Sequence, residues 1–188
     1  KGLQERASIG IQLQWRALDI NIQPEYLRAE NLRQEAFKGN TLDGNWWVRY
    51  FYHVQNNVDD YRKLGNEAVD EFNFGQSRIG LKYNKFAVGI SNENLWFGPG
   101  RKNSLVMTNN ASGFAHAYLQ TNQPIKTKIG HFEAKLILGI LQPTNFKHPD
   151  DSIIRTIWDG AIAPKLNNNR NLQAITINWN PKWMPNFY

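Results

Sequence analysis

The sequence predicts an all-β fold: an antiparallel transmembrane β-barrel, of which this chain is a segment, with short helical or loop insertions. Apolar residues recur at every second position in several segments, as in strands with two different faces. No run of about 20 apolar residues could form a spanning helix, whereas a barrel strand needs only about 10 residues. Aromatic residues make up 13% of the chain, which suits girdles at two membrane interfaces and equally an aromatic-rich soluble β-protein.

The charge of the chain favours an anionic partner. Its 22 basic and 16 acidic residues give a formal net charge of +6, which would attract lipopolysaccharide, an acidic polysaccharide or nucleic acid. The basic residues are scattered along the sequence, so we expect no nucleic-acid partner. The chain has no cysteine, and its histidines show no metal-binding spacing, so we expect neither a metal site nor a cofactor.

The first elements predicted are two short strands joined by a tight turn. Apolar side chains alternate over 7–15, and after residues 16–17 the alternation continues in the opposite phase over 18–22. A turn between antiparallel strands produces such a change of phase. The charged stretch 26–38 has apolar residues spaced as in a short helix or an ordered excursion.

The middle of the chain contains the clearest hairpin. Residues 46–54 alternate with aromatic side chains on both faces and predict a strand, and the polar stretch 56–72 predicts a long loop. Apolar residues then alternate over 79–83 and again over 86–90, on either side of an Asn-Lys pair. This spacing predicts two antiparallel strands joined by a two-residue turn.

The second half predicts four further strands, at 115–120, 132–140, 153–158 and 172–179, which brings the expected total to eight or nine. The first two each have an apolar face and a polar face. We expect three polar residues of one strand to face three of the other: His116, Tyr118 and Gln120 against His131, Glu133 and Lys135. The apolar faces are expected to meet lipid in a barrel, through Ile9, Ile11, Leu13, Phe132, Leu136 and Leu138.

Several motifs in the middle of the chain occur in the order seen in one known family. They are Gly75-Gln76-Ser77, Glu93-Asn94-Leu95-Trp96-Phe97-Gly98-Pro99-Gly100, Ser104-Leu105-Val106-Met107-Thr108-Asn109-Asn110-Ala111 and Lys128-Ile129-Gly130-His131-Phe132-Glu133. The chain therefore resembles the Wzi-type capsule assembly proteins, which carry GQS, EN-x-WWGPG, SLLMSNNA and TPIG-x-FE at these places. It departs from them mildly, at Phe97, Thr108 and Lys128.

The resemblance implies a barrel of about eighteen strands in the outer membrane of a Gram-negative bacterium. We therefore expect residues 1–188 to be a single β-barrel domain that is incomplete at both ends, and we expect the start of the encoded protein, with its signal peptide, to be missing from this sequence. The implied function is to bind or anchor surface polysaccharide in capsule assembly, without enzymatic activity. The implied partners are outer-membrane lipid, lipopolysaccharide, surface polysaccharide and other outer-membrane proteins.

The stretch around Trp96 has the side chains that sugar recognition needs. Trp96 offers a ring for stacking, Asn94 offers planar hydrogen-bonding groups, and Arg101 offers a cation for acidic sugars. The alternative is that Trp96 packs beneath an inward loop while Glu93 and Arg101 pair with each other. The full set of candidate polysaccharide-binding residues is Glu93, Asn94, Trp96, Arg101, Asn109, Asn110, His116, Tyr118 and Glu133.

No catalytic residue is predicted. The sequence has no HExxH motif, no G-x-S-x-G nucleophile elbow and no phosphate-binding glycine loop. Its paired carboxylates are adjacent in sequence, so on a strand they would point to opposite faces. Two other functions stay open: a porin-like channel or accessory subunit of an outer-membrane complex, and a soluble all-β carbohydrate-active enzyme.

Overall fold

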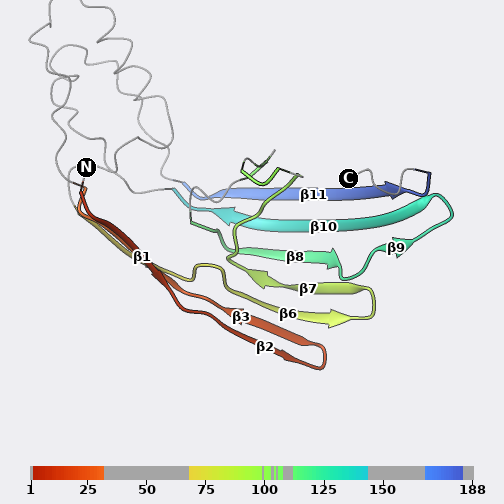
Figure 1. Ribbon diagram of the computed structural model, residues 1–188, viewed down its shortest axis with the longest axis horizontal. Helices are drawn as coiled ribbons and strands as arrows, with labels where there is room; N and C mark the ends of the chain where they lie inside the picture. The colour runs from red at the N-terminus through yellow and green to blue at the C-terminus, as the bar shows by residue number, and fades with distance from the viewer. Residues whose placement is uncertain are drawn as a thin grey trace, which may run out of the picture. The chain divides into compact units, whose positions relative to one another are not determined.

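The computed structural model describes residues 2–31, 68–98, 100–102, 104, 106–107, 112–143 and 168–183 (Figure 1). Every regular element in these ranges is a β-strand, which confirms the all-β antiparallel prediction. No helix among the described residues is long and apolar enough to span a membrane. The predictions for residues 32–38, 46–54, 56–67 and 153–158, and the candidates Asn109 and Asn110, lie outside the described residues.

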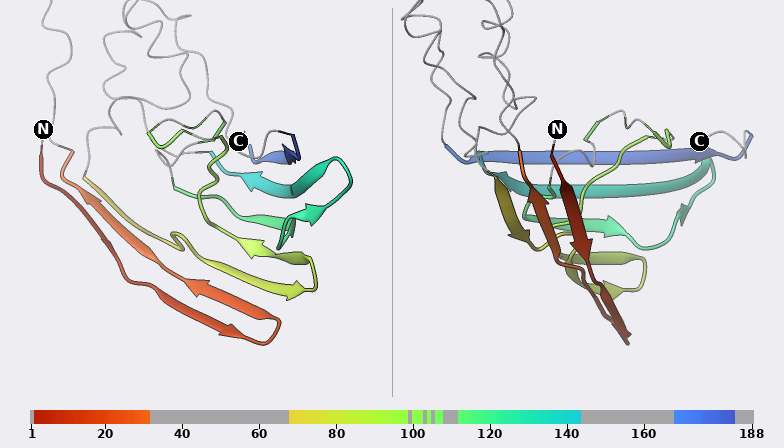
Figure 2. Two further views of the ribbon diagram at one scale, coloured as in Figure 1. Left: turned by 45° about the vertical axis from the view of Figure 1, so that its right-hand side comes forward. Right: turned by 60° about the vertical axis from the view of Figure 1, so that its left-hand side comes forward.

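Most strands form one antiparallel sheet in the order β11-β10-β8-β7-β6-β3-β2, with β9 beside β10. Figure 2 shows that this larger sheet twists strongly from β11 to β2. The bounds of its strands are β2 (Ile11–Trp15), β3 (Leu18–Ile22), β6 (Arg78–Tyr83), β7 (Phe86–Ser91), β8 (His116–Thr121), β9 (Ile125–Lys126), β10 (Gly130–Leu141) and β11 (Arg170–Pro181).

A second, three-stranded sheet has the order β1-β4-β5, with β1 (Gln4–Ser8), β4 (Glu25–Ala29) and β5 (Val69–Asn73). The chain divides into two compact units, and the larger comprises 7–26, 72–142 and 169–188. The described strands do not close into a barrel, because β2 and β11 are the two ends of the larger sheet. The eleven described strands already exceed the eight or nine expected.

The hairpin at 79–90 is confirmed as β6 and β7, and the strands expected at 115–120, 132–140 and 172–179 are confirmed as β8, β10 and β11. Three other predictions were wrong. The strand expected over 7–15 is interrupted at Ile9 and Gly10, because β1 belongs to the smaller sheet while β2 pairs with β3. The first residues of the helix expected over 26–38 belong to strand β4. The last residues of the loop expected over 56–72 belong to strand β5.

On the larger sheet the apolar face is exposed and the polar face is buried. A soluble domain has the reverse arrangement. One row of cross-strand partners is entirely apolar and runs Trp15, Leu18, Leu81, Val88, Leu119, Leu136, Ile175. Its members are largely exposed, with Leu81 at 53% and Val88 at 51%. We call this side of the sheet the exposed face. The next row on it continues through Leu13, Ile20, Ile79, Ile90, Ala117 and Leu138.

The other side, which we call the buried face, carries polar, charged and small residues together with the core. One row of partners there runs Asp19, Gly80, Gly89, Tyr118, Ile137, Ala174. Asp19 is 3% exposed and Ile137 is fully buried. The period of two that was predicted from sequence therefore separates an apolar exposed face from a polar buried face.

Tyr118 lies flat across two strands because the row beneath it contains glycine. A β-carbon at Gly80 would collide with the Tyr118 hydroxyl, and one at Gly89 would lie 2.8 Å from the same oxygen. Any larger residue at either position would lift the ring from the sheet. The small residues at these two positions thus determine where the tyrosine packs.

We predict that Gly80→Ala destabilises the protein by about 1 to 3 kcal/mol through overpacking, and that adding Tyr118→Phe restores most of this loss. The reason is that the added methyl group meets the phenolic oxygen before any other atom. The free energy of unfolding in urea measures both effects.

Gly89→Ala is the matched control. Its β-carbon would also meet two backbone atoms, the Ile79 carbonyl oxygen and, at 2.7 Å, the Gly80 Cα, so Tyr118→Phe should restore much less of the lost stability there. Equal recovery at both glycines, or an unchanged stability for Gly80→Ala, would contradict the packing described.

Candidate functional site

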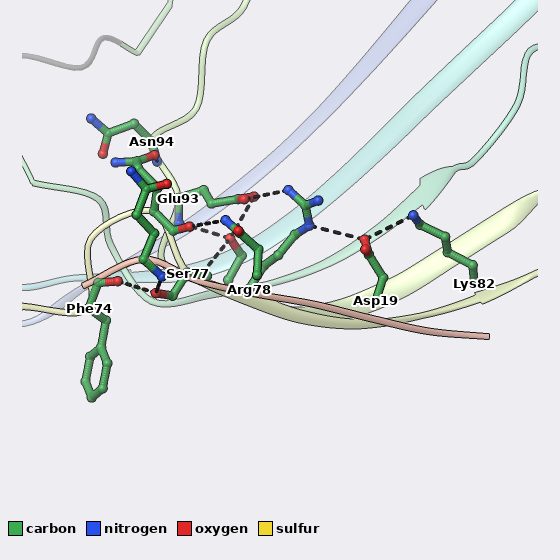
Figure 3. Close-up of polar contacts among 11 residues, drawn as sticks. Asp19, Phe74, Ser77, Arg78, Lys82, Glu93 and Asn94 are labelled. Atoms are coloured by element: carbon green, nitrogen blue, oxygen red, sulfur yellow. Dashed lines mark hydrogen bonds and ion pairs between the residues drawn. The ribbon is translucent and has the colours of Figure 1, made fainter. Parts of the chain in front are cut away.

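A chain of ion pairs crosses the buried face, with Arg78 at its centre (Figure 3). Its Nη1 lies 2.6 Å from Glu93 Oε1 and its Nε lies 3.3 Å from Asp19 Oδ2. Lys82 Nζ approaches the same Asp19 oxygen at 3.1 Å. We call Asp19, Arg78, Lys82 and Glu93 the ion cluster.

The register of β3 and β6 explains why Asp19 has two cations. Asp19 is the cross-strand partner of Gly80, and Arg78 and Lys82 are the residues two before and two after that glycine on the same face. Both long side chains can therefore reach one carboxylate from opposite directions. Asp19 is almost completely buried, and a carboxylate in such a place requires paired charges or hydrogen bonds to compensate its lost hydration.

Glu93 is held just beyond the end of β7 by the last residue of that strand. The Glu93 backbone N–H donates to Ser91 Oγ at 3.0 Å, and the Ser91 hydroxyl lies 3.3 Å from Glu93 Oε2. Glu93 therefore pairs with Arg78 and Ser91, and the alternative pairing of Glu93 with Arg101 is wrong. The ion cluster thus fixes the start of the connection between β7 and β8.

The next residues of that connection are anchored to the stretch just before β6. The Asn92 N–H donates to the Ser77 carbonyl oxygen at 2.8 Å, and the Asn94 N–H donates to Gln76 Oε1 at 3.0 Å. The Asn92 side chain also donates to the Gly75 carbonyl oxygen at 3.3 Å. Asn94 therefore serves in part as a structural residue.

The segment that follows presents an aromatic ring and two cations. Trp96 is 36% exposed, and its indole N–H donates to the Gly100 carbonyl oxygen at 2.8 Å. Ser104 Oγ accepts from the Phe97 N–H at 3.1 Å and donates within 2.8 Å to the Phe97 carbonyl, so it closes the turn. Arg101 and Lys102 are exposed. We call residues 96–98 and 100–102 the Trp96 segment.

The polar patch expected between β8 and β10 forms only in part. His116 and Tyr118 are buried, and Lys135 Nζ lies 5.5 Å from the centre of the Tyr118 ring. The cross-strand partners of His116 and Tyr118 are, however, Gly139 and Ile137. Phe114 packs against Gly139, and its carbonyl oxygen lies 2.8 Å from His116 Nδ1.

The expectation that His131 and Glu133 face His116 and Tyr118 was therefore wrong. His131 pairs with Lys126 of β9, and Glu133 pairs with Asn178 of β11. The physical reason is the short strand β9, which lies between β8 and β10 in sequence and occupies the near end of β10. Both residues are exposed.

Sequence reasoning missed Asp19, Arg78 and Lys82, which form most of the ion cluster. A signal was available, because all three occupy the polar positions of strands whose other positions are apolar. Among the described residues, no group of three or more His, Cys, Asp or Glu side chains could hold a metal ion. The ion pairs and hydrogen bonds of the ion cluster provide charge pairing on the buried face.

We predict a strong energetic coupling between Arg78 and Glu93, about 1 to 2 kcal/mol in a double-mutant cycle of Arg78→Gln and Glu93→Gln. The pair is short and its side chains are only 29% and 24% exposed. Urea unfolding of the four proteins in the cycle measures the coupling.

The control cycle is Arg28→Gln with Asp70→Asn, a pair separated by 3.9 Å whose side chains are 56% and 57% exposed. Solvent screening should hold that coupling to about 0.5 kcal/mol or less. Similar couplings for the two pairs would show that the ion cluster is an ordinary surface contact.

Comparison with known proteins places the chain in a family. The family model of the capsule assembly protein Wzi matches residues 6–159, a range that contains the ion cluster and the Trp96 segment. Searches of the curated proteins and of the solved structures each gave no match. Because the matched range covers most of the 188 residues, the chain belongs to the Wzi family of capsule assembly proteins.

Proposed function

We propose that the chain is part of an outer-membrane β-barrel that binds or anchors surface polysaccharide in capsule assembly and catalyses no reaction. Membership of the capsule assembly family supports the process and the compartment. The antiparallel sheet supports the architecture. The single observation that carries the membrane assignment is the apolar exposed face opposite a buried face that contains the ion cluster.

The exposed face disfavours a soluble enzyme. A monomeric soluble protein rarely exposes a contiguous apolar patch of more than a few hundred Å², because such a surface promotes association. Here cross-strand partners on all seven long strands of the larger sheet contribute apolar side chains to one row. The free energy of such an apolar row is lower in hydrocarbon than in water. The strands of transmembrane barrels alternate in the same way, with apolar side chains toward lipid and polar side chains toward the lumen.

The Trp96 segment supports the binding of acidic sugars. An exposed indole ring can stack on the apolar face of a sugar, and the neighbouring cations of Arg101 and Lys102 attract carboxylate or phosphate groups. The hydrogen bonds of Ser104 and Gly100 hold this turn in shape before a ligand arrives. A porin-like channel built on the same sheet would conduct ions and retain no polysaccharide.

We predict that Ile175→Arg impairs assembly into the outer membrane, with a cost of about 2 to 4 kcal/mol at mid-bilayer depth. Ile175 is 67% exposed, so an arginine there would be harmless in water. It precedes the exposed aromatic residue Trp179 by four positions, or about 13 Å along a strand. Heat-modifiable migration of the protein from outer-membrane fractions measures assembly.

Asn178→Arg is the matched control, because Asn178 lies on the same strand, is also exposed and points to the opposite face beside Glu133. It should assemble normally. If Ile175→Arg assembles as well as Asn178→Arg, the exposed face does not meet lipid.

We predict that Trp96→Ala and Arg101→Ala each reduce the retention of capsule at the cell surface several-fold while the melting temperature stays unchanged. Loss of the stacking ring and of its hydrogen bond to the Gly100 carbonyl oxygen explains the first effect, and loss of attraction explains the second, so only the Arg101 effect should shrink as salt rises. Retention and melting are measured on the same variants.

Trp183→Ala removes another exposed tryptophan and should leave retention unchanged. If the Trp96→Ala, Arg101→Ala double variant retains polysaccharide normally, these residues do not bind it. If retention falls only in step with the melting temperature, their role is structural.

A further inference from the structure

One end of the larger sheet gathers turns that carry basic residues. The β2–β3 turn contains Arg16, the β6–β7 turn contains Lys85, and the residues around β9 include Lys126 and Lys128. Lys182 follows directly after β11. Figure 1 shows these turns at the same end of the sheet. We call Arg16, Lys85, Lys126, Lys128 and Lys182 the basic rim.

Hydrogen bonds join neighbouring turns into a continuous edge. The Lys82 N–H donates to the Ala17 carbonyl oxygen at 2.7 Å, and the Asn122 N–H donates to the Lys85 carbonyl oxygen at 2.7 Å. Further along, the Lys182 N–H lies 3.4 Å from the Ile129 carbonyl oxygen. The cations of the basic rim are therefore spaced along a defined edge of the sheet.

No carboxylate lies among the described residues of these turns, 16–17, 84–85, 122–129 and 182–183. The described acids of the larger unit are elsewhere: Asp19 and Glu93 in the ion cluster, Glu25 in β4, and Glu133 on the face of β10 opposite the apolar row. All five side chains of the basic rim are exposed. The edge therefore presents positive charge to its surroundings.

Exposed aromatic side chains lie on the exposed face next to the basic rim. Trp15, Tyr83, Phe86 and Trp179 occupy the strand positions nearest the turns, and Trp183 packs edge-on against Trp179 with ring centres 5.3 Å apart. Phe132 stacks on Trp179, and the Arg16 guanidinium lies 5.2 Å from the Trp15 ring. Aromatic rings between an apolar band and a row of cations are typical of a lipid headgroup region.

One turn retains a cation at a conformational cost. Arg16 has a φ of 52°, in the left-handed region that glycine and asparagine adopt more easily. Asn84, in the corresponding hairpin turn, has a φ of 51°. Glycine or asparagine would adopt this φ more easily, but neither carries a charge. Arginine at this position adds a positive charge to the edge of the sheet.

We infer that the basic rim binds the headgroups of anionic phospholipids, with the aromatic rings set at the boundary between headgroups and hydrocarbon. This inference rests on the proposed outer-membrane function. The short turns of such barrels lie on the periplasmic side, where the leaflet is built from phospholipid. Lysine side chains can extend along the apolar band and place their ammonium groups at the phosphates.

The test uses the complete barrel of which this chain is proposed to be part, assembled in vesicles of phosphatidylcholine with a minor fraction of spin-labelled phosphatidylglycerol or spin-labelled phosphatidylcholine. The motionally restricted signal gives the relative association of the two lipids with the protein. We expect about a threefold preference for phosphatidylglycerol that falls toward one in 1 M NaCl. The Lys126→Gln, Lys128→Gln, Lys182→Gln triple variant should lose most of this preference.

Two single variants on β11 provide a matched comparison. Lys182→Gln removes a cation next to the end of the strand at the basic rim, and Arg170→Gln removes one at the opposite end of the same strand. Only Lys182→Gln should lower the preference. An equal loss in both variants, or a preference that persists in the triple variant, would overturn the inference.

The outcomes separate this inference from the proposed function. Failure of the complete barrel to assemble in any vesicle would contradict the membrane assignment itself. Assembly with no preference for phosphatidylglycerol would contradict only the basic rim. A stronger association with lipid A than with phosphatidylglycerol would place the basic rim in the outer leaflet and would also overturn it.

Discussion

The buried carboxylate of Asp19 imposes the constraint on which the larger sheet depends. It lies almost wholly out of solvent and stays compensated only while β6 presents Arg78 and Lys82 to it across Gly80. A slip of one residue between β3 and β6 would carry both cations to the other face and turn the apolar row inward. Charge pairing on one face and apolar exposure on the other are thus two results of one register.

Much of the larger sheet could be predicted because its signal is local. Alternation over 79–83 and 86–90 is contained in the two strands themselves, and the turn needs only Asn84 and Lys85. The break at Ile9 and Gly10 could not be predicted, since the period of two continues through it and only the exchange of pairing partners ends the strand. β4 and β5 were missed for a related reason: their backbone partners are distant in sequence, and their many charges suggested a helix and a loop.

The candidate site was predicted less well than the strands. Glu93, Trp96 and Arg101 stand in a recognisable motif, but the partner of Glu93 comes from β6 and that of Arg78 from β3, 59 residues away. Such contacts exist only once three strands have paired. The predicted pairing of β10 with β8 was wrong near His131. An uninterrupted hairpin would place β8 beside His131, but the two residues of β9 pair with β10 there instead.

Under the proposed function, the ion cluster has a structural role and the Trp96 segment recognises polysaccharide. A sugar carboxylate that bound Arg78 would have to displace Asp19 or Glu93, and a buried charge that loses its partner costs about 3 to 5 kcal/mol. The cations of the cluster are therefore poor ligands for polysaccharide. Their effect is to fix Glu93, which stands three residues before Trp96 at the start of the connection that carries the exposed ring. Under the proposed function, recognition then falls to exposed cations such as Arg101.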